Sequence, residues 1–213
     1  SIHRLVMASE FKDEDTGDHI VRIGEYSSLM AQKLNQSKEF IDTIHYSAPM
    51  HDIGKIGIPD KILLKPGKLT SEEFETMKTH SVIGAKLLSE SNSLILQMAH
   101  EIAMSHHEKF NGKGYPRGLK GEAIPLSGRI VAIADTFDAL TSRRPYKDPY
   151  PPEVVYEIMK KERGEHFDPH ILDLFIDHYD EFVAIRGKIG PSDADVLTNF
   201  MVSERDREIG LIP

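Results

Sequence analysis

The sequence has no cysteine and no long apolar run, and each absence excludes a class of protein. Without cysteine there is neither a disulfide framework nor a thiolate metal site, a composition typical of a cytosolic protein. No apolar segment approaches the ~20 residues that a membrane-spanning helix needs, and no signal peptide opens the chain. We therefore expect a cytoplasmic domain. The 213 residues suit one domain with at most a small appendage.

Positive charge is also scarce. Lysine and arginine number 26 against 34 aspartates and glutamates, which gives a net charge of −8. A protein that holds a polynucleotide by neutralising its phosphates needs the opposite balance, so we expect no polynucleotide partner. A small phosphorylated ligand held by a few local cations remains compatible. What the sequence has in number is histidine, at 11, and position must show which of these are functional.

Apolar residues recur at helical spacing through nearly the whole chain, with no convincing alternating strand and no internal repeat. The sequence therefore predicts an all-α fold made of a single multi-helix domain. The expected helices cover about residues 18–34, 37–52, 71–80, 81–90, 93–108, 130–140, 152–162 and 168–185. Ser37 and Asp168 are candidate N-caps, and Thr70 to Glu73 read as a capping box.

The chain divides into three parts. Residues 1–12 are predicted to end a connecting helix from an upstream sensory or receiver domain, and their apolar face suggests a helical contact in a homodimer. Residues 13–186 are expected to form the main domain, and residues 187–213 a polar tail. Because the sequence begins with serine rather than methionine, we expect a piece of a longer protein, in which a membrane anchor could lie elsewhere.

Histidine and aspartate gather near the ends of the predicted helices. The residues concerned are the doublets His51-Asp52 and His106-His107, together with His19, His80 and Asp135, and Asp15 one turn before His19. Any one of them alone would more often be a solvated side chain near a helix end. Together they match the ligands of Fe, Mn, Zn or Mg. Successive helix residues diverge by about 100°, so doublets suit two neighbouring metal ions, with Asp52 as the bridging ligand.

Three longer strings carry a family resemblance. HDIGKIGIPD at 51–60 is followed by HHEKFNGKGYPRGLKGEAIP at 106–125 and IADTFDALTSRRPYK at 133–147. In this order they resemble the HD-GYP family, the branch of the HD phosphohydrolases named for its HD ligands and its Gly-Tyr-Pro loop. The resemblance implies a metal site of two or three ions, often iron, in a helical core. It also implies cleavage of cyclic di-GMP, a bacterial second messenger, to pGpG and on to GMP.

Carried over residue by residue, the resemblance implies a ligand set. Its members are His19, His51, Asp52, His80, His106, His107 and Asp135. The family usually has glutamate where this chain has Asp15, and aspartate is shorter by one methylene. We therefore expect a two-metal core and leave a third ion at Asp15 open. Iron is the expected metal, with Mn, Zn, Ni and Mg as alternatives.

Catalysis is assigned to a hydroxide that bridges two metals, because no serine or cysteine nucleophile with a partner base is evident. Asp52 is expected to bridge, and Lys55 to stabilise phosphate charge, although a cation at a helix C-terminus would read the same way. The resemblance places Tyr115, Arg144 and Lys147 against the ligand.

Asp138 lies three residues after Asp135 and faces the same way. We expect it to contact a base of the substrate or to hydrogen-bond to a metal ligand. The alternative is a solvated carboxylate without such a role.

Several functions remain open at this point. A phosphodiesterase that prefers 3′,3′-cyclic GMP-AMP, as some relatives do, is one alternative to cyclic di-GMP hydrolysis. A mononucleotide phosphohydrolase is another, although Arg144, Lys147 and the Gly-Tyr-Pro loop count against it. A third is a module that binds a cyclic dinucleotide, or docks on a diguanylate-cyclase (GGDEF) domain through the loop at 111–125, with little activity. The intact ligand set disfavours this third reading.

Overall fold

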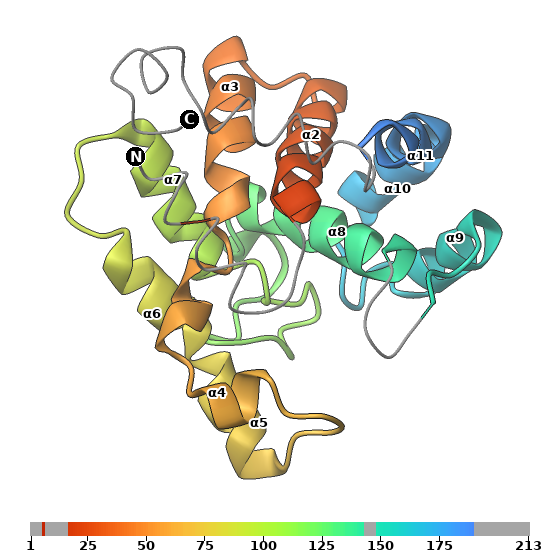
Figure 1. The fold of residues 1–213 in the computed structure, drawn as a ribbon. Helices are drawn as coiled ribbons and strands as arrows, with labels where there is room; N and C mark the ends of the chain where they lie inside the picture. Colours follow the sequence, from red (N-terminus) through yellow and green to blue (C-terminus); the bar gives the residue numbers. More distant parts are fainter. Residues whose placement is uncertain (1–5, 7–16, 143–147, 190–213) are drawn as a thin grey trace, which may run out of the picture.

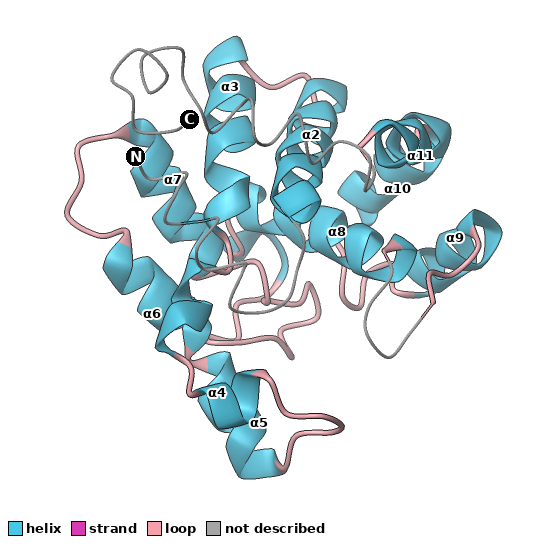
Figure 2. Cartoon of the chain, viewed as in Figure 1, coloured by secondary structure: helices cyan, strands magenta, loops and turns pink. Residues whose placement is uncertain are grey.

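The computed structural model describes residue 6, residues 17–142 and residues 148–189, and this part of the chain is helical (Figure 1, Figure 2). The α-helices are α2 (Gly17–Lys33), α3 (Lys38–Ser47), α4 (Asp60–Leu63), α5 (Ser71–Lys78), α6 (His80–Leu87), α7 (Leu94–Ala103), α8 (Leu126–Thr141), α9 (Pro152–Lys161), α10 (Pro169–Asp177) and α11 (Tyr179–Lys188). Short 3-10 helices cover Ala48–Met50, Ile53–Gly57 and Gly121–Ala123. These residues contain no strand, only an isolated bridge between Arg163 and Phe167, so the predicted all-α class is confirmed.

Helices α2, α3, α7 and α8 pack against one another at the centre of the fold, with α2 between α3 and α8. In Figure 1, α9 to α11 lie to one side of this centre, and α4 and α5 project from its lower end. Buried aromatic rings join α2 and α8 to α10 and α11. The ring centroid of Tyr26 lies 5.2 Å from that of Phe137, and the centroid of Phe175 lies 5.3 Å from that of Phe137 and 4.8 Å from that of Phe182. This core fixes α2 and α8, each of which carries a predicted metal ligand.

The predicted helix starts are confirmed where a cap was identified. Ser37 Oγ accepts a hydrogen bond from the backbone of Phe40 at 3.2 Å. Thr70 Oγ1 accepts from the Glu73 amide at 3.2 Å while the Glu73 carboxylate accepts from the Thr70 amide at 2.8 Å, which completes the capping box. Asp168 accepts from two amides in the first turn of α10.

The predicted helix over 37–52 ends early. α3 stops at Ser47 and a 3-10 turn follows, because Pro49 has no N–H to donate and its ring clashes with the carbonyl one turn back. His51 and Asp52 therefore lie in the turn between two 3-10 helices rather than at the end of α3.

Two other predicted helices were too long. α7 ends at Ala103 rather than near residue 108, and the hydroxyl of Ser105 donates to the carbonyl of Glu101 at 2.5 Å just past its end. The predicted helix over 168–185 is two helices, divided at His178, whose imidazole contacts Glu181 in the first turn of α11 at 3.0 Å.

The predicted helix end at His80 was also wrong. α5 ends at Lys78, and His80 is the first residue of α6. Between them, Thr79 donates its hydroxyl to the carbonyl of Thr76 at 2.6 Å, a local bond that competes with continuation of the helix.

Some predicted features fall outside the described residues. They are Asp15, Arg144, Lys147, most of the segment 1–12 and nearly all of the tail 187–213. Val6 is described: it is helical, 1% exposed, and packs in a small apolar cluster with Ile20, Met50 and Ile53, beside the HD doublet. Val6, the one described residue of the predicted connecting segment, thus lies against the core next to the candidate site. None of the described helices has the length and apolar character to cross a bilayer.

Candidate metal centre

The predicted metal ligands within the described residues converge from separate helices and turns into two groups. The ligand atoms of each group all lie within 4.8 Å of one another. The four-ligand group consists of Asp52, His80, His106 and His107, and the three-ligand group consists of His19, His51 and Asp135. These side chains come from positions spread over more than a hundred residues, so the tertiary fold has to bring them together.

Asp52 stands between the two groups. Its Oδ1 lies 3.1 Å from Nε2 of His80 and 3.3 Å from Nε2 of His106. Its Oδ2 lies 3.4 Å from Nε2 of His51, which is itself 3.8 Å from the carboxylate of Asp135. One oxygen therefore faces each group, which is the arrangement that a bridging carboxylate requires.

The tautomers of four histidines follow from their outer hydrogen bonds. In three of them Nδ1 contacts a backbone carbonyl: that of Ala48 at 3.0 Å from His51, of Met77 at 2.7 Å from His80, and of Ile102 at 3.0 Å from His106. In His19, Nδ1 contacts the Asp138 carboxylate at 2.8 Å. Carbonyl and carboxylate oxygens accept only, so Nδ1 carries the hydrogen, and in the neutral ring Nε2 keeps its lone pair. A ring held in this way is the usual form of a metal-ligating histidine.

The inward atoms fit divalent cations. Oδ1 of Asp52 and Nε2 of His80 and His106 are buried and have no hydrogen-bond partner among the described residues. Buried polar atoms are nearly always paired. Here the Nε2 lone pairs of His80 and His106 face Oδ1 of Asp52 at 3.1 and 3.3 Å. Two acceptors this close repel each other unless a cation lies between them. A nitrogen and oxygen set without sulfur suits Fe, Mn, Zn or Mg.

The pKa shifts of Asp52, His106 and His107 agree with a ligand role. Burial alone would raise the pKa of Asp52, but nearby positive charge, above all that of Lys55, holds this pKa well below its usual range. Burial lowers the pKa of His106, and burial together with the neighbouring His106 lowers that of His107 further. Burial also opposes protonation of His19, but the hydrogen bond and charge of Asp138 outweigh it and raise the pKa. The carboxylate is thus ionised, and His106 and His107 favour the neutral form that binds metal.

The Gly-Tyr-Pro loop is folded back onto the turn that carries His106-His107. Tyr115 stacks on His107 with ring centroids 4.8 Å apart and an interplanar angle of 27°, and its amide donates to the His107 carbonyl at 3.2 Å. A side chain at Gly114 would meet the Lys109 amide nitrogen at 2.2 Å, so only glycine fits there. The predicted contact between Tyr115 and substrate stays a prediction. The described contacts hold its ring against His107, a predicted metal ligand.

Glu108 organises this loop and was not identified from the sequence. The residue is 2% exposed, and its carboxylate accepts from the amides of Arg117 at 2.8 Å and Leu119 at 3.0 Å. Its position directly after the His-His doublet was the available signal.

Lys55 and Asp138 occupy different surroundings. Lys55 Nζ lies 2.8 Å from Oδ2 of Asp52. Asp138 is 1% exposed and is bonded to His19 and Arg22, so the predicted substrate contact does not fit its burial. Its position corresponds to the second predicted role, support of a metal ligand from behind.

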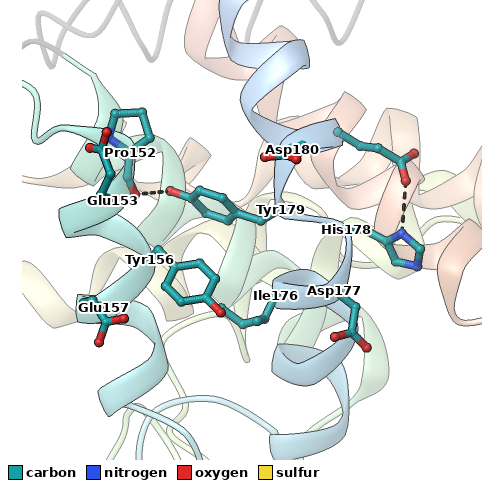
Figure 3. Close-up of a pocket in the computed structure, with 10 residues that line it drawn as sticks. Pro152, Glu153, Tyr156, Glu157, Ile176, Asp177, His178, Tyr179 and Asp180 are labelled. Carbon is teal, nitrogen blue, oxygen red and sulfur yellow. Dashed lines mark hydrogen bonds and ion pairs between the residues drawn. The ribbon is translucent and has the colours of Figure 1, made fainter.

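A separate groove lies between α9 and the junction of α10 with α11 (Figure 3). Tyr156 and Tyr179 line it together with several carboxylates, and the Tyr179 hydroxyl donates to the Pro152 carbonyl at 2.7 Å. None of its lining residues is a predicted site residue. Its negative charge disfavours a phosphorylated ligand, so the metal centre is the better candidate site.

Comparison with known proteins defines the class. A protein-family model described as an HD domain matches residues 7–171, more than half of the chain, and the chain therefore belongs to the HD-domain family. A cyclic di-GMP phosphodiesterase of Thermotoga maritima is 52% identical over 172 residues, which cover 81% of this chain and 47% of the relative. The resemblance to the HD-GYP branch predicted from the motifs is confirmed.

A 3′3′-cGAMP-specific phosphodiesterase 2 of Vibrio cholerae is 43% identical over 188 residues, which cover 88% of this chain and 36% of that relative. The chain thus spans half or less of the length of these two relatives. The fold resembles the crystal structure of a cyclic GMP-AMP specific phosphodiesterase of V. cholerae, with a TM-score of 0.64, 18% identity, and coverage of 92% of this chain and 53% of that one. At that identity the likeness concerns the fold alone.

Proposed function

We propose that this chain is the catalytic domain of a metal-dependent phosphodiesterase that hydrolyses cyclic di-GMP to pGpG, GMP or both. The observation that carries the proposal is the convergence of the four-ligand and three-ligand groups on the two oxygens of Asp52. The relative from T. maritima, named a cyclic di-GMP phosphodiesterase, supports the choice of substrate.

The residues of the two groups would hold one divalent ion each, with Asp52 shared. Bound there, such ions supply a nucleophile from water near neutral pH and stabilise the charge that develops on phosphate. Iron is the proposed native metal, with Mn, Zn, Ni and Mg as alternatives. A third ion at Asp15 stays a prediction that the proposed two-ion centre does not require.

The side chains themselves bind and orient. Asp138 holds the imidazole of His19 in one tautomer, so that Nε2 faces inward. Lys55 is a fixed positive charge 2.8 Å from Asp52, at the place where a phosphate oxygen would approach the pair. Tyr115 stacks on His107 and would form part of one wall of the site. Arg144 and Lys147 are proposed to bind the substrate as well.

A second substrate is supported by a specific observation. The relative from V. cholerae that is 43% identical is named 3′3′-cGAMP-specific. Both substrates are cyclic dinucleotides with two phosphodiester bonds, and they differ in one base. The metal centre would serve either, so base recognition outside the centre would decide between them.

The proposal extends to the setting of the domain. We place it in the cytoplasm, downstream of a sensory or receiver region joined through residues 1–12, with residues 13–186 as the catalytic unit and 187–213 as a tail. A GGDEF-domain protein is the proposed partner of the loop at 111–125, and a homodimer is proposed through the connecting helix. The packing of Val6 against Met50 and Ile53 supports a link between the upstream segment and the HD doublet.

Product analysis tests the proposed activity. Metal-replete protein is incubated separately with cyclic di-GMP, 3′,3′-cyclic GMP-AMP and GMP-type mononucleotides, and products are separated by chromatography. Formation of pGpG or GMP from cyclic di-GMP is expected. Cleavage of cyclic GMP-AMP alone would move the proposal to the second substrate. Tight binding without product, or turnover of mononucleotides only, would contradict it.

A further inference from the structure

Arg22 is a buried cation one helical turn after His19 on α2. Its side chain is 4% exposed. Nε donates to Oδ1 of Asp138 at 2.6 Å and Nη2 donates to Oδ2 of the same carboxylate at 3.0 Å. This two-bond contact matches the fork of a guanidinium to the plane of a carboxylate, and lysine could not reproduce it.

Arg22 and His19 both bind Oδ2 of Asp138. His19 Nδ1 donates to this oxygen at 2.8 Å, and Ser142 Oγ lies 3.2 Å from it. Arg22 Nη2 also donates to Ser142 Oγ at 3.1 Å. Because Arg22 holds both oxygens, the carboxylate cannot rotate away from His19. The guanidinium therefore determines the direction in which Nε2 of His19 points.

His19 differs in this respect from the other supported histidines. His51, His80 and His106 donate to backbone carbonyls, which a side-chain substitution does not remove. His19 depends on a side-chain network that joins α2 to the end of α8 across 119 positions of sequence. A defect in this network would act on the three-ligand group alone.

We propose that Arg22 is a positioning residue that sets the metal affinity of the three-ligand group, by holding Asp138 in the orientation that fixes His19. The inference rests on the proposed metal centre and adds to it a residue that touches neither metal nor substrate. Supporting partners of ligating histidines typically change metal affinity about 10–100-fold when they are altered.

A second arginine–aspartate contact in the same fold provides a matched control. Arg129 Nη1 lies 2.6 Å from Oδ2 of Asp168, and Arg129 Nε donates to the Ile124 carbonyl at 2.9 Å. This contact joins α8 to the N-cap of α10 and involves none of the proposed ligands. Arg129→Lys should therefore weaken the fold without changing metal affinity.

The experiment titrates metal-free protein with Mn²⁺ by calorimetry, for the unchanged chain, Arg22→Lys and Arg129→Lys. We expect two equivalents in the unchanged chain. In Arg22→Lys one equivalent should bind about 10–100-fold more weakly and the other as before. Arg129→Lys should bind both as the unchanged chain does. Activity of Arg22→Lys should recover as Mn²⁺ is raised to saturation.

Ser142→Ala removes one bond to Asp138 and one to Arg22, and keeps the proposal testable should Arg22→Lys not fold. It should weaken the same equivalent by a smaller factor. In a His19→Ala background, Arg22→Lys should have no further effect on metal binding, because Arg22 acts through His19.

Unchanged affinity of both equivalents in folded Arg22→Lys and in Ser142→Ala would overturn the inference. So would equal weakening of both equivalents in Arg22→Lys and Arg129→Lys, which would show only a loss of fold stability. Fewer than two equivalents in the unchanged chain would defeat the proposed centre itself, and the inference with it.

Discussion

The two ligand groups are held in different ways. In the four-ligand group, His80 and His106 are oriented by carbonyls three and four residues earlier in their own turns. In the three-ligand group, His19 is oriented by Asp138, which lies 119 positions away on another helix. His51, the other histidine of the three-ligand group, also donates to a backbone carbonyl, so among these four histidines His19 alone depends on a side chain that the tertiary fold must deliver. The three-ligand group is therefore the one that a substitution outside the ligands can disturb.

Asp52 faces both ligand groups, so its substitution should have the largest effect. Asp52→Asn keeps the shape but replaces one oxygen with an amide that cannot serve both groups. We expect product formation to fall by about a thousandfold or more, with metal lost from both groups. Rates and metal content per chain are measured together. Asp173→Asn, which breaks an exposed pair with Arg163, is the control and should leave both values unchanged.

Removing one histidine from each group should separate them. His106→Ala and His19→Ala should each lose one equivalent of metal and reduce the rate by about a hundredfold. The equivalent that remains in His19→Ala should match the one that Arg22→Lys leaves unchanged. His178→Ala, at a surface contact with Glu181, is the control. Loss of both equivalents in either variant would mean that the groups do not bind independently.

Lys55 should matter for the reaction more than for the metals. Lys55→Met removes a positive charge 2.8 Å from Asp52, and we expect kcat to fall about 10–100-fold with two equivalents still bound. Lys33→Met, which breaks a surface pair with Glu181, should have no effect. A loss of metal that parallels the loss of rate would show that Lys55 acts only by keeping Asp52 ionised.

The smallest effect is expected at the stacked ring beside the four-ligand group. Tyr115→Phe keeps the ring on His107, so the rate should change by less than about threefold, whereas Tyr115→Ala should reduce it by up to about tenfold. Steady-state kinetics with cyclic di-GMP measure both. If Tyr115→Phe alone raises KM strongly, the hydroxyl binds substrate, as the motif predicted.

Much of the fold was predictable because its signals are local, whereas the convergence of the predicted ligands was expected from the family resemblance. Helical periodicity gave the all-α class, and Ser37, Thr70 and Asp168 gave three helix starts through a cap and its partner two or three residues away. Helix ends were predicted less well. Pro49 removes a helical hydrogen bond and Thr79 makes a competing local one, and apolar periodicity records neither.

The supporting network could not be predicted for a different reason. The spacing of Asp138 from Asp135 fixed the direction of its side chain but not what it meets, and Arg22 follows His19 at a spacing that many surface residues share. Only the packing of α2 against α8 puts these residues within 3.0 Å of one another.

The central claim is that two cations are held on either side of Asp52, and anomalous diffraction tests it most directly. Crystals of protein prepared with iron under reducing conditions would be measured on both sides of the iron absorption edge. The account predicts two anomalous peaks in each chain, one among Asp52, His80, His106 and His107 and the other among His19, His51, Asp52 and Asp135. A single peak, or density with these side chains turned away from it, would contradict the account.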